Sequence, residues 1–458
     1  MTDGYREETG PRDPLSIVQR ARLTPDGTAL RTVEGDLSWR EAARRAGEIW
    51  RRWEPDAVDR PLVRVARADL ETILTVWAAL EVRRPLILLS GKLTRSELMA
   101  TRDELASIRE PLAPGTAVVM MTSGTTGRAK PAMITREALL ASARANAANL
   151  SLGPDDVWQL AISPARIGGL SILTRCLMAG SAVALTGRFT VEEFLRSLLR
   201  DRITVASIVP TMLAKLLDEA PGVAVPSTLR AVLVGGASLT PALRAGAVRQ
   251  GWPVMTTYGM TETASNVVTT PFAERWEDND SLGLPNRGVE LEIREGEVWV
   301  RGEMLAAGYW GGKRWPKGAW FPTGDLGQWD ADGRLRILSR RTDLIVSGGE
   351  NVYPAEVEGA LEAIPGVRHA MVLGLEDPVW GSVVTALIEV TDAAPDNRQI
   401  AMMLKERLAP YKCPRRMARV AHLPVTPAGK PDRRSAVLEG LSLDVLHYSE
   451  RHAPVSSV

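Results

Sequence analysis

The sequence has few of the residues from which metal centres and disulfide frameworks are usually built. Its 458 residues include two cysteines, Cys176 and Cys413, which lie far apart and form no C-x-x-C pair. We therefore expect two reduced thiols in a cytoplasmic protein. All four histidines lie in the last quarter of the chain: His369, His422, His447 and His452. A histidine-based zinc site or a Ser-His-Asp triad within the first 368 residues is thereby excluded.

Long apolar runs and a strong charge imbalance are also absent. No uninterrupted apolar stretch is long enough to span a bilayer, and the N-terminal segment MTDGYREETGPRDP lacks the apolar centre of a signal peptide, so no membrane insertion is expected. The formal net charge of +1 argues against nucleic acid as the main partner. The length predicts two or more domains, whereas the sequence does not indicate an oligomeric state.

Short apolar runs alternate with helical patterns along most of the chain. The expected strands and the helices that follow them are 117–121 with 136–150, 181–187 with 191–201, 203–210 with 211–220, and 229–236 with 240–251. This alternation is typical of an α/β fold with a largely parallel sheet. After about residue 285 short strands and turns replace it, and the segment NVYPAEVEGALEAI begins a second pattern. We therefore predict a domain of residues 1–339 and a smaller one of residues 340–458.

A small, hydroxyl-rich and glycine-rich loop, MTSGTTGRAKP (residues 121–131), lies between an expected strand and a helix that starts near Thr135. Its many backbone N–H groups and hydroxyls are well suited to bind phosphate. It has no Walker A register. Taken alone, such a cluster is more often a surface turn, so the loop by itself does not decide the function.

Four further segments give this loop its context. They are TTYGMTETAS (256–265), WFPTGDLG (320–327), RILSRRTDLIVSGGENVYPAEVE (336–358) and LPVTPAGKPDRR (423–434). In this order and spacing the chain resembles, from about Ser38 to Arg434, the adenylate-forming superfamily of acyl- and aryl-CoA synthetases. The resemblance implies a large N-terminal α/β domain and a small, mobile C-terminal α+β domain with the active site between them. It also implies ATP, Mg²⁺ and coenzyme A as cofactors.

The resemblance assigns nucleotide-binding roles to residues in these segments. Those expected around the β- and γ-phosphates are Thr122, Ser123, Gly124, Thr125, Thr126, Gly127 and Lys130. Those expected around adenine and in the same binding region are Gly235, Gly236, Ala237, Tyr258, Gly259 and Thr261. Asp325 is expected to bind the ribose hydroxyls, and Arg340 the ribose or a phosphate.

Three further assignments concern the chemistry. Glu262 matches a Mg²⁺-binding glutamate and Lys430 a lysine that reaches the α-phosphate during adenylation, while Gly348 and Gly349 match a turn along which pantetheine runs. Simpler explanations exist for each residue alone. Glu262 could be a helix N-terminal glutamate, and Lys430 an exposed lysine on a solvated face.

The acid substrate is indicated by weaker signals. The segments IGGLSILTRCL (167–177), TETAS and GGEN and the compact length resemble the o-succinylbenzoyl-CoA synthetases of menaquinone biosynthesis. Two positions depart from the family pattern: Arg166 stands where such ligases usually have histidine, and Thr342 where many relatives have a hinge aspartate. Arg166 is either a surface residue or a cation that binds a substrate carboxylate through two parallel hydrogen bonds.

Three functions of different kinds are therefore compared. The first is an acid–thiol ligase that forms an acyl-adenylate and then a CoA thioester, with Lys430, Glu262 and Arg166 in its catalytic site. The second is an adenylation enzyme that charges a separate carrier protein. The third is a non-catalytic nucleotide-binding relic, against which the joint presence of Glu262, Asp325, Arg340 and Lys430 argues.

Overall fold

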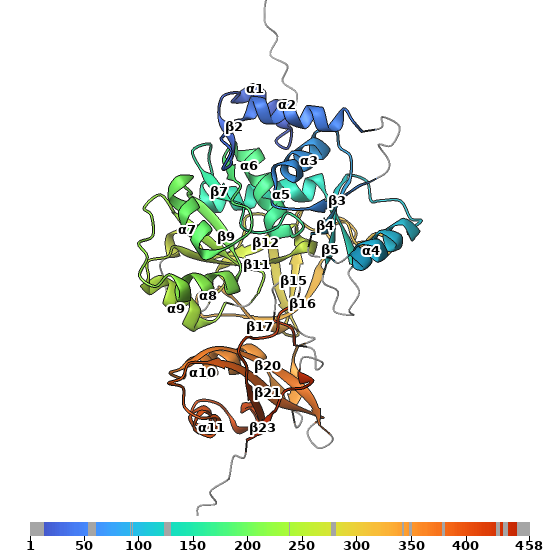
Figure 1. Ribbon diagram of the computed structural model, residues 1–458. Coiled ribbons are helices and arrows are strands. Elements are labelled where there is room, and N and C mark those ends of the chain that lie inside the picture. Colours follow the sequence, from blue (N-terminus) through green and yellow to red (C-terminus); the bar gives the residue numbers. More distant parts are fainter. Residues whose placement is uncertain are drawn as a thin grey trace, which may run out of the picture.

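The chain folds into a large N-terminal domain and a small C-terminal domain, which lie one below the other in Figure 1. The computed structural model describes residues 13–53, 61–91, 93, 95–122, 130–237, 239–275, 281–340, 343–347, 350–377, 381–426, 431–433 and 438–446. None of the helices in these ranges combines the length and apolar character that a bilayer crossing requires. The predicted fold class is confirmed.

A nine-stranded sheet forms the centre of the large domain, in the order β13-β12-β11-β10-β9-β7-β8-β1-β2. The strands from β1 to β11 along this order run parallel, whereas β12, β13 and β2 are antiparallel to their neighbours. The middle strands β9 and β10 are fully buried, as expected for strands covered on both faces. Their bounds are β1 (Thr28–Arg31), β2 (Leu37–Ser38), β7 (Val157–Gln159), β8 (Ala182–Ala184), β9 (Val205–Ile208), β10 (Ala231–Val234), β11 (Val254–Met260), β12 (Ser265–Thr269) and β13 (Leu284–Pro285).

Helices follow the strands as the alternation predicts. Several begin at a side-chain cap, such as Thr135 before α5 and Thr240 before α9, whose hydroxyls accept hydrogen bonds from backbone N–H groups of the first turn. The rings of Trp39 and Trp77, both fully buried, pack 5.3 Å apart between α2 and α3. The helices are α1 (Ile17–Leu23), α2 (Trp39–Trp50), α3 (Leu70–Glu81), α4 (Arg95–Ser107), α5 (Arg136–Leu150), α6 (Ile167–Ala179), α7 (Val191–Arg200), α8 (Pro210–Glu219) and α9 (Pro241–Arg249).

A second sheet of the large domain corrects one expectation about the phosphate loop. Its strands are β3 (Leu62–Ala66), β4 (Leu86–Ser90), β5 (Thr116–Thr122) and β6 (Lys130–Thr135). The loop does not run from a strand into a helix, because β6 returns antiparallel to β5 before α5 begins. The short run KPAMIT pairs with β5 along its whole length, and its buried centre, Ala132 to Ile134, completes the sheet.

The third sheet consists of the short strands predicted after residue 285. They are β14 (Glu290–Arg294), β15 (Glu297–Arg301), β16 (Phe321–Trp329) and β17 (Leu335–Arg340), paired antiparallel in this order. The next strand, β18, belongs to a different sheet. The change of sheet falls beside the predicted boundary at residue 340, although the boundary itself stays a prediction.

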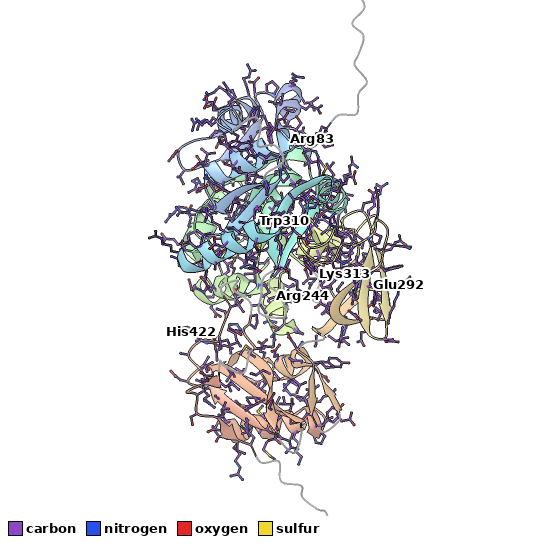
Figure 2. The ribbon with its side chains drawn as sticks, turned by 90° about the vertical axis from the view of Figure 1, so that its right-hand side faces the viewer. Arg83, Arg244, Glu292, Trp310, Lys313 and His422 are labelled. Carbon is purple, nitrogen blue, oxygen red and sulfur yellow. The ribbon has the colours of Figure 1, made fainter. Side chains whose placement is uncertain are left out.

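In its described residues the small domain is a mostly antiparallel sheet with two α-helices, the α+β type that the resemblance implies. Its strands are β18 (Ile345–Ser347), β19 (Glu350–Val352), β20 (Val367–Asp377), β21 (Gly381–Val390), β22 (Arg416–Arg419) and β23 (Asp444–Val445), and its helices are α10 (Pro354–Glu362) and α11 (Asn397–Lys405). Helix α10 touches α9 of the large domain. Figure 2 shows His422 on the small domain, in the part that faces the large one.

Candidate active site

A cavity of about 1400 Å³ lies where the parallel strands of the nine-stranded sheet end. Its lining includes the residues that follow β9, β10 and β11 and those at the start of α6 and α8. Ligands of α/β proteins commonly bind at this edge of the sheet. The predicted site residues that line the cavity are Thr122, Lys130, Arg166, Gly235, Gly236, Ala237, Gly259, Thr261 and Glu262.

Other predicted residues are not part of this lining. Tyr258 and Asp325 are direct chain neighbours of lining residues. Of Arg340 only the backbone is described, as the end of β17. The predicted residues outside the described parts of the chain are Ser123, Gly124, Thr125, Thr126, Gly127, Gly348, Gly349 and Lys430.

The segment after β10 offers a surface of bare backbone. A Cβ atom on Gly235 would lie 2.2 Å from the hydroxyl oxygen of Thr257, so a side chain there would collide with β11. Gly236 has a φ of +83°, a conformation that residues with side chains rarely adopt. A flat ring can therefore approach the backbone closely here, as the predicted adenine site requires.

Residues predicted to bind the adenine and the ribose come together from three separate segments. The Tyr258 hydroxyl donates a hydrogen bond to Oδ2 of Asp325, at 2.8 Å. Asp325 is only 3% exposed, and it pairs across the sheet with Arg340. The turn before it is held by the Thr323 hydroxyl, which accepts a hydrogen bond from the Asp325 N–H. Tyr258 and Asp325, from two motifs, thus meet, and the backbone of Arg340, from a third motif, lies beside Asp325.

Glu262 lies in a short 3-10 turn, η2 (Thr261–Thr263), at the end of β11. Its carbonyl oxygen accepts a hydrogen bond from the N–H of Ala306, and its Oε1 accepts one from the hydroxyl of Tyr309, at 2.7 Å. The explanation of Glu262 as a helix N-terminal glutamate does not fit, because η2 has three residues and is followed by β12.

The surroundings of Glu262 suit a metal that takes most of its ligands from elsewhere. In the described ranges no three histidine, cysteine or acidic side chains come together as a metal site. Glu262 could therefore give one carboxylate to a cation whose other ligands are phosphate oxygens and water. Mg²⁺ bound to a nucleotide has this ligand set, whereas a structural zinc ion does not.

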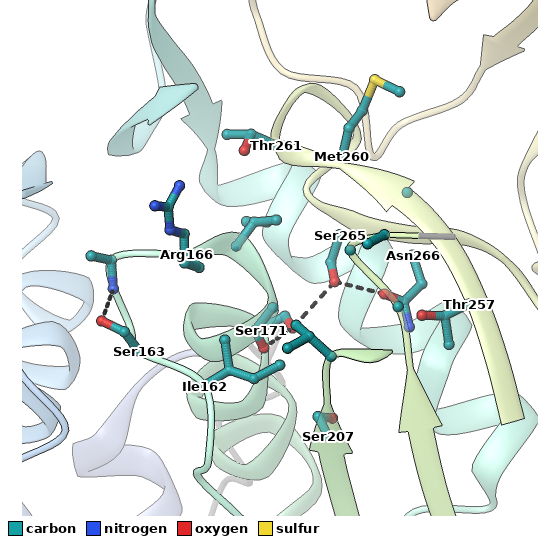
Figure 3. Close-up of a pocket in the computed structure, with 18 of the residues that line it drawn as sticks. Ile162, Ser163, Arg166, Ser171, Ser207, Thr257, Met260, Thr261, Ser265 and Asn266 are labelled. Atoms are coloured by element: carbon teal, nitrogen blue, oxygen red, sulfur yellow. Dashed lines mark hydrogen bonds between the residues drawn. The ribbon is translucent and has the colours of Figure 1, made fainter. Parts of the chain in front are cut away.

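Arg166 immediately precedes α6, and its side chain points away from the helix into the cavity, on the side where Thr261 lies (Figure 3). The start of α6 is packed tightly, since a Cβ atom on Gly169 would lie 2.3 Å from the carbonyl oxygen of Ser163. Burial lowers the pKa of Arg166. Within the described chain the guanidinium has no hydrogen-bond or ion-pair partner, so a negative group in the cavity would be its first.

Sequence reasoning missed Arg175, the other arginine that α6 brings to the cavity. It is 2% exposed, and burial lowers its pKa to about 9. One guanidinium nitrogen donates to the Ser265 hydroxyl at 3.1 Å, the group lies 5.4 Å from the centre of the Trp158 ring, and Nε has no partner among described atoms. An arginine within the apolar run IGGLSILTRCLMA was the available signal.

Positive charge exceeds negative charge around the cavity. Its basic lining residues are Arg67, Lys130, Arg166, Arg175, Arg188 and Lys215, and its acidic ones are Glu262 and Glu297. Glu297 already accepts a hydrogen bond from the N–H of Gly324. The cavity is therefore suited to ligands that carry several negative charges.

Comparison with known proteins agrees with this geometry. The AMP-binding enzyme family matches residues 59–310, and the AMP-binding enzyme C-terminal domain matches residues 356–430. The 2-succinylbenzoate–CoA ligase of Bacillus licheniformis is 33% identical, over 91% of this chain and 98% of that protein.

Solved structures give the same result. The o-succinylbenzoate CoA synthetase of Bacillus subtilis is 30% identical and superimposes with a TM-score of 0.79 in complex with the acyl-adenylate intermediate, covering 93% of this chain and 98% of that one. The complex of the same enzyme with ATP and magnesium also superimposes with a TM-score of 0.79, covering 91% of this chain and 98% of that one. Together with the site geometry, these matches show that the chain belongs to the AMP-binding enzyme family, the adenylate-forming superfamily that its motifs predict.

Proposed function

We propose that this protein converts o-succinylbenzoate, ATP and coenzyme A into o-succinylbenzoyl-CoA, AMP and pyrophosphate. The relatives named for this activity support the proposal. The observation that carries it is the pair Arg166 and Arg175, two cations of one cavity without a carboxylate partner in the described chain. A cytoplasmic location belongs to the same proposal and rests on the two free, buried cysteines.

In the first half-reaction a carboxylate oxygen of the acid attacks the α-phosphorus of ATP, and pyrophosphate leaves. Tyr258 and Asp325 would hold the ribose while the adenine lies against the backbone from Gly235 to Ala237. Lys130 would contact the β- and γ-phosphates, and Lys430 the α-phosphate. Glu262 would hold Mg²⁺, which would further neutralise the phosphate charge. This positive charge allows two anions to approach each other.

The acid has two carboxylates, of which only one reacts. The other must be desolvated on binding, which is unfavourable unless a cation accompanies it. Arg166 is the proposed partner, since its guanidinium points into the cavity and has two parallel donors to offer. Arg175 lies deeper and provides a second candidate for the same group.

In the second half-reaction the thiol of coenzyme A attacks the acyl-adenylate, and AMP leaves. Gly348 and Gly349 are proposed to line the path of the pantetheine arm after a rotation of the small domain. Another aryl or acyl acid, or a carrier protein as thiol acceptor, would use the same nucleotide site. These alternatives differ from the proposal in the acid and the thiol, and not in the adenylation chemistry.

Pyrophosphate exchange with a panel of acids tests the proposal. We expect o-succinylbenzoate to promote exchange and, with coenzyme A added, to give a CoA thioester. Two matched acids, 2-butanoylbenzoate and 4-oxo-4-phenylbutanoate, each keep one of the two carboxylates. The analogue that lacks the reacting carboxylate should promote no exchange, because it cannot form the acyl-adenylate. The analogue that lacks only the unreactive carboxylate should be a poorer substrate by about ten- to a hundredfold, the value of one charge-assisted hydrogen bond.

Other outcomes would change the conclusion in defined ways. Equal activity with benzoate and short fatty acids would refute the dicarboxylate substrate. Exchange without thioester formation on coenzyme A would favour a carrier-protein acceptor. No exchange with any acid would support a nucleotide-binding protein without ligase activity.

A further inference from the structure

The segment from Ala306 to Trp315 joins two parts of the active site that are distant in sequence. It pairs with β6 through backbone hydrogen bonds and reaches η2 through a fourth. The bonds are Met133 N–H to Gly308 O, Ala307 N–H to Met133 O, Trp310 N–H to Pro131 O and Ala306 N–H to Glu262 O, each at 2.8 Å. Figure 2 shows Trp310 and Lys313 of this segment on the large domain. The segment thus holds the end of the phosphate loop and the Glu262 turn together.

Tyr309 is the residue of this segment that faces both parts. Its hydroxyl donates to Oε1 of Glu262 at 2.7 Å, and its ring lies 5.3 Å from the Nζ atom of Lys130. The ring also packs edge-on against Trp315, with centroids 5.2 Å apart, and Trp315 packs in the same way against Phe321 at 4.8 Å. Three aromatic rings therefore fix the direction of the phenol.

We propose that Tyr309 is a positioning residue for the Mg²⁺-binding carboxylate. Its hydrogen bond occupies Oε1 of Glu262 and holds the carboxylate in one orientation, so that Oε2 is left for a cation in the cavity. No described residue donates to Oε2. Hydrogen bonds to a metal-binding carboxylate commonly serve this purpose, and their loss weakens metal binding about ten- to a hundredfold.

The contact between the Lys130 ammonium group and the Tyr309 ring is a cation–π contact, and it brings Lys130 into the same arrangement. Lys130 and Glu262 carry opposite charges, yet the Tyr309 ring lies beside the lysine while its hydroxyl binds the carboxylate. The ring thereby favours a geometry in which both charges face the cavity, where both are lining residues. Lys130 and a metal held by Glu262 could then act on the same phosphates, because the lysine is not neutralised by the Glu262 carboxylate.

Nucleotide binding tests this inference, which rests on the proposed role of Glu262. The probe is the α,β-methylene analogue of ATP, whose Kd is measured calorimetrically with and without Mg²⁺. The readout is the Kd without Mg²⁺ divided by the Kd with Mg²⁺. We expect Tyr309→Phe, which keeps the ring contacts, to reduce this ratio about tenfold or more while Kd without Mg²⁺ stays the same. If the role of Tyr309 were purely structural, the substitution would raise both Kd values together.

Two further variants separate the possible failures. Tyr411→Phe removes a phenol hydroxyl from the small domain and should leave the ratio unchanged. Glu262→Gln should abolish the effect of Mg²⁺. If Glu262→Gln does so and Tyr309→Phe does not, the positioning role is wrong while the metal site stands. If Mg²⁺ still tightens binding to Glu262→Gln, the proposed metal site itself is wrong.

Discussion

Arg175 carries a charge that the described protein does not neutralise with a carboxylate. Its contacts are the Ser265 hydroxyl and the Trp158 ring, and its pKa is lowered by burial. Arg166, nine residues earlier, is likewise buried in part and unpaired in the described chain. Keeping such charges reduces stability, and an anionic substrate would compensate for this by supplying the missing partner.

Substitution of Arg166 tests the binding of the unreactive carboxylate. We expect Arg166→Ala to raise the KM for o-succinylbenzoate about ten- to a hundredfold, because one charge-assisted bond is lost. The KM values for benzoate and ATP should barely change, and Arg166→His should recover part of the loss. Steady-state kinetics with both acids checks this. An equal response of the two acids would instead assign Arg166 to the reacting carboxylate or to the fold.

Substitution of Arg175 tests the compromise between stability and binding. Arg175→Met should raise the free energy of unfolding by about 1 to 3 kcal/mol, since a buried charge is replaced by an apolar chain of similar length. It should also weaken binding of the dicarboxylic acid. Arg244→Met is the matched control, because Arg244 is buried outside the cavity lining. Loss of stability in Arg175→Met would contradict the expectation.

At the scale of elements, the turn between β11 and β12 places Glu262 through close backbone contact. Ala264 and Ser265 have positive φ values, 47° and 109°, which are strained for residues with side chains. Gly259 pairs with Asn266, and a Cβ atom on it would be 2.0 Å from the Ser265 carbonyl oxygen. The strands can therefore pair in this way only while position 259 lacks a side chain.

Gly259→Ala should accordingly separate β11 from β12 and move Glu262. We expect lower stability, by about 1 to 3 kcal/mol, together with a greater Mg²⁺ requirement in adenylation. Gly359→Ala in α10 is the control, since no atom lies within 4 Å of its added Cβ atom and alanine favours a helix by about 1 kcal/mol. Thermal unfolding and a Mg²⁺ titration of both variants give the comparison. Equal stability of Gly259→Ala and the parent would show that the turn can adapt.

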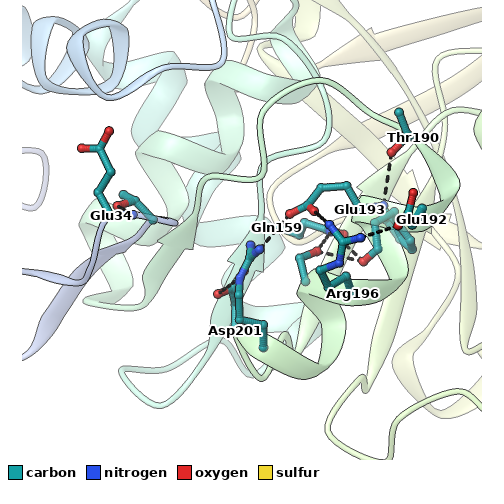
Figure 4. A network of polar contacts seen from close by, with 11 residues as sticks. Glu34, Gln159, Thr190, Glu192, Glu193, Arg196 and Asp201 are labelled. Carbon is teal, nitrogen blue, oxygen red and sulfur yellow. Dashed lines mark hydrogen bonds and ion pairs between the residues drawn. The ribbon is translucent and has the colours of Figure 1, made fainter.

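Helix α7 shows how much of an element the sequence alone determines. Phe194 and Leu198 are buried on one side, and the exposed side carries Glu192 and Arg196, which belong to the polar network of Figure 4. There Arg196 pairs with Glu192 and Glu193, which are four and three positions away. Such spacing can be read directly from VEEFLRSLLRD, because helix neighbours are set by local geometry. These exposed pairs add little stability, so the buried side decides where α7 packs.

At the scale of the whole molecule, a polar contact connects the described parts of the two domains. Glu362 at the end of α10 hydrogen-bonds to the side chain of Thr240, which caps α9 of the large domain. Glu362 also accepts a hydrogen bond from the N–H of Ala370. Burial raises the pKa of Glu362 from its ordinary value of 4.5 to about 7. The nearby carboxylate of Glu358 acts in the same direction.

This raised pKa makes stability depend on pH. The folded protein keeps a proton on Glu362 that the unfolded chain releases between about pH 4.5 and 7. The contribution of Glu362 to the free energy of unfolding is thus fully present below pH 4.5. This contribution, about 3 kcal/mol, is lost as the pH rises through 7. Glu362→Gln should be more stable than the parent at pH 8 and similar at pH 5. Denaturant unfolding at both pH values checks this, with the exposed Glu303→Gln as control; equal curves at pH 8 would contradict it.

The rotation proposed for the small domain predicts an uneven effect of substituting Lys430. We expect Lys430→Ala to slow adenylation about a hundredfold or more, since a charge that stabilises the transition state is lost. Thioester formation from preformed acyl-adenylate and coenzyme A should keep most of its rate. Separate assays of the two half-reactions, with Lys405→Ala as control, measure this. Equal damage to both would show that Lys430 acts throughout the cycle.

The sequence by itself determined the family and the alternation of strands and helices, and it predicted several residues that line the cavity. These features depend on short segments whose local pattern is sufficient, such as the buried run AVLV of β10 and the pair Tyr258 and Glu262 within one motif. The course of the chain after the phosphate loop was predicted wrongly. KPAMIT is short, and pairing with β5 decided that it forms a strand before α5 begins.

Only the tertiary structure decided which distant residues act together. Tyr309 meets Glu262 across 47 positions and Arg175 meets Ser265 across 90, contacts that no local pattern contains. Both depend on how separate segments pack: the 306–315 segment against β6, and α6 against β12. Side-chain periodicity specifies which face of an element is buried, whereas the partner across that face is chosen by the packing of the whole domain.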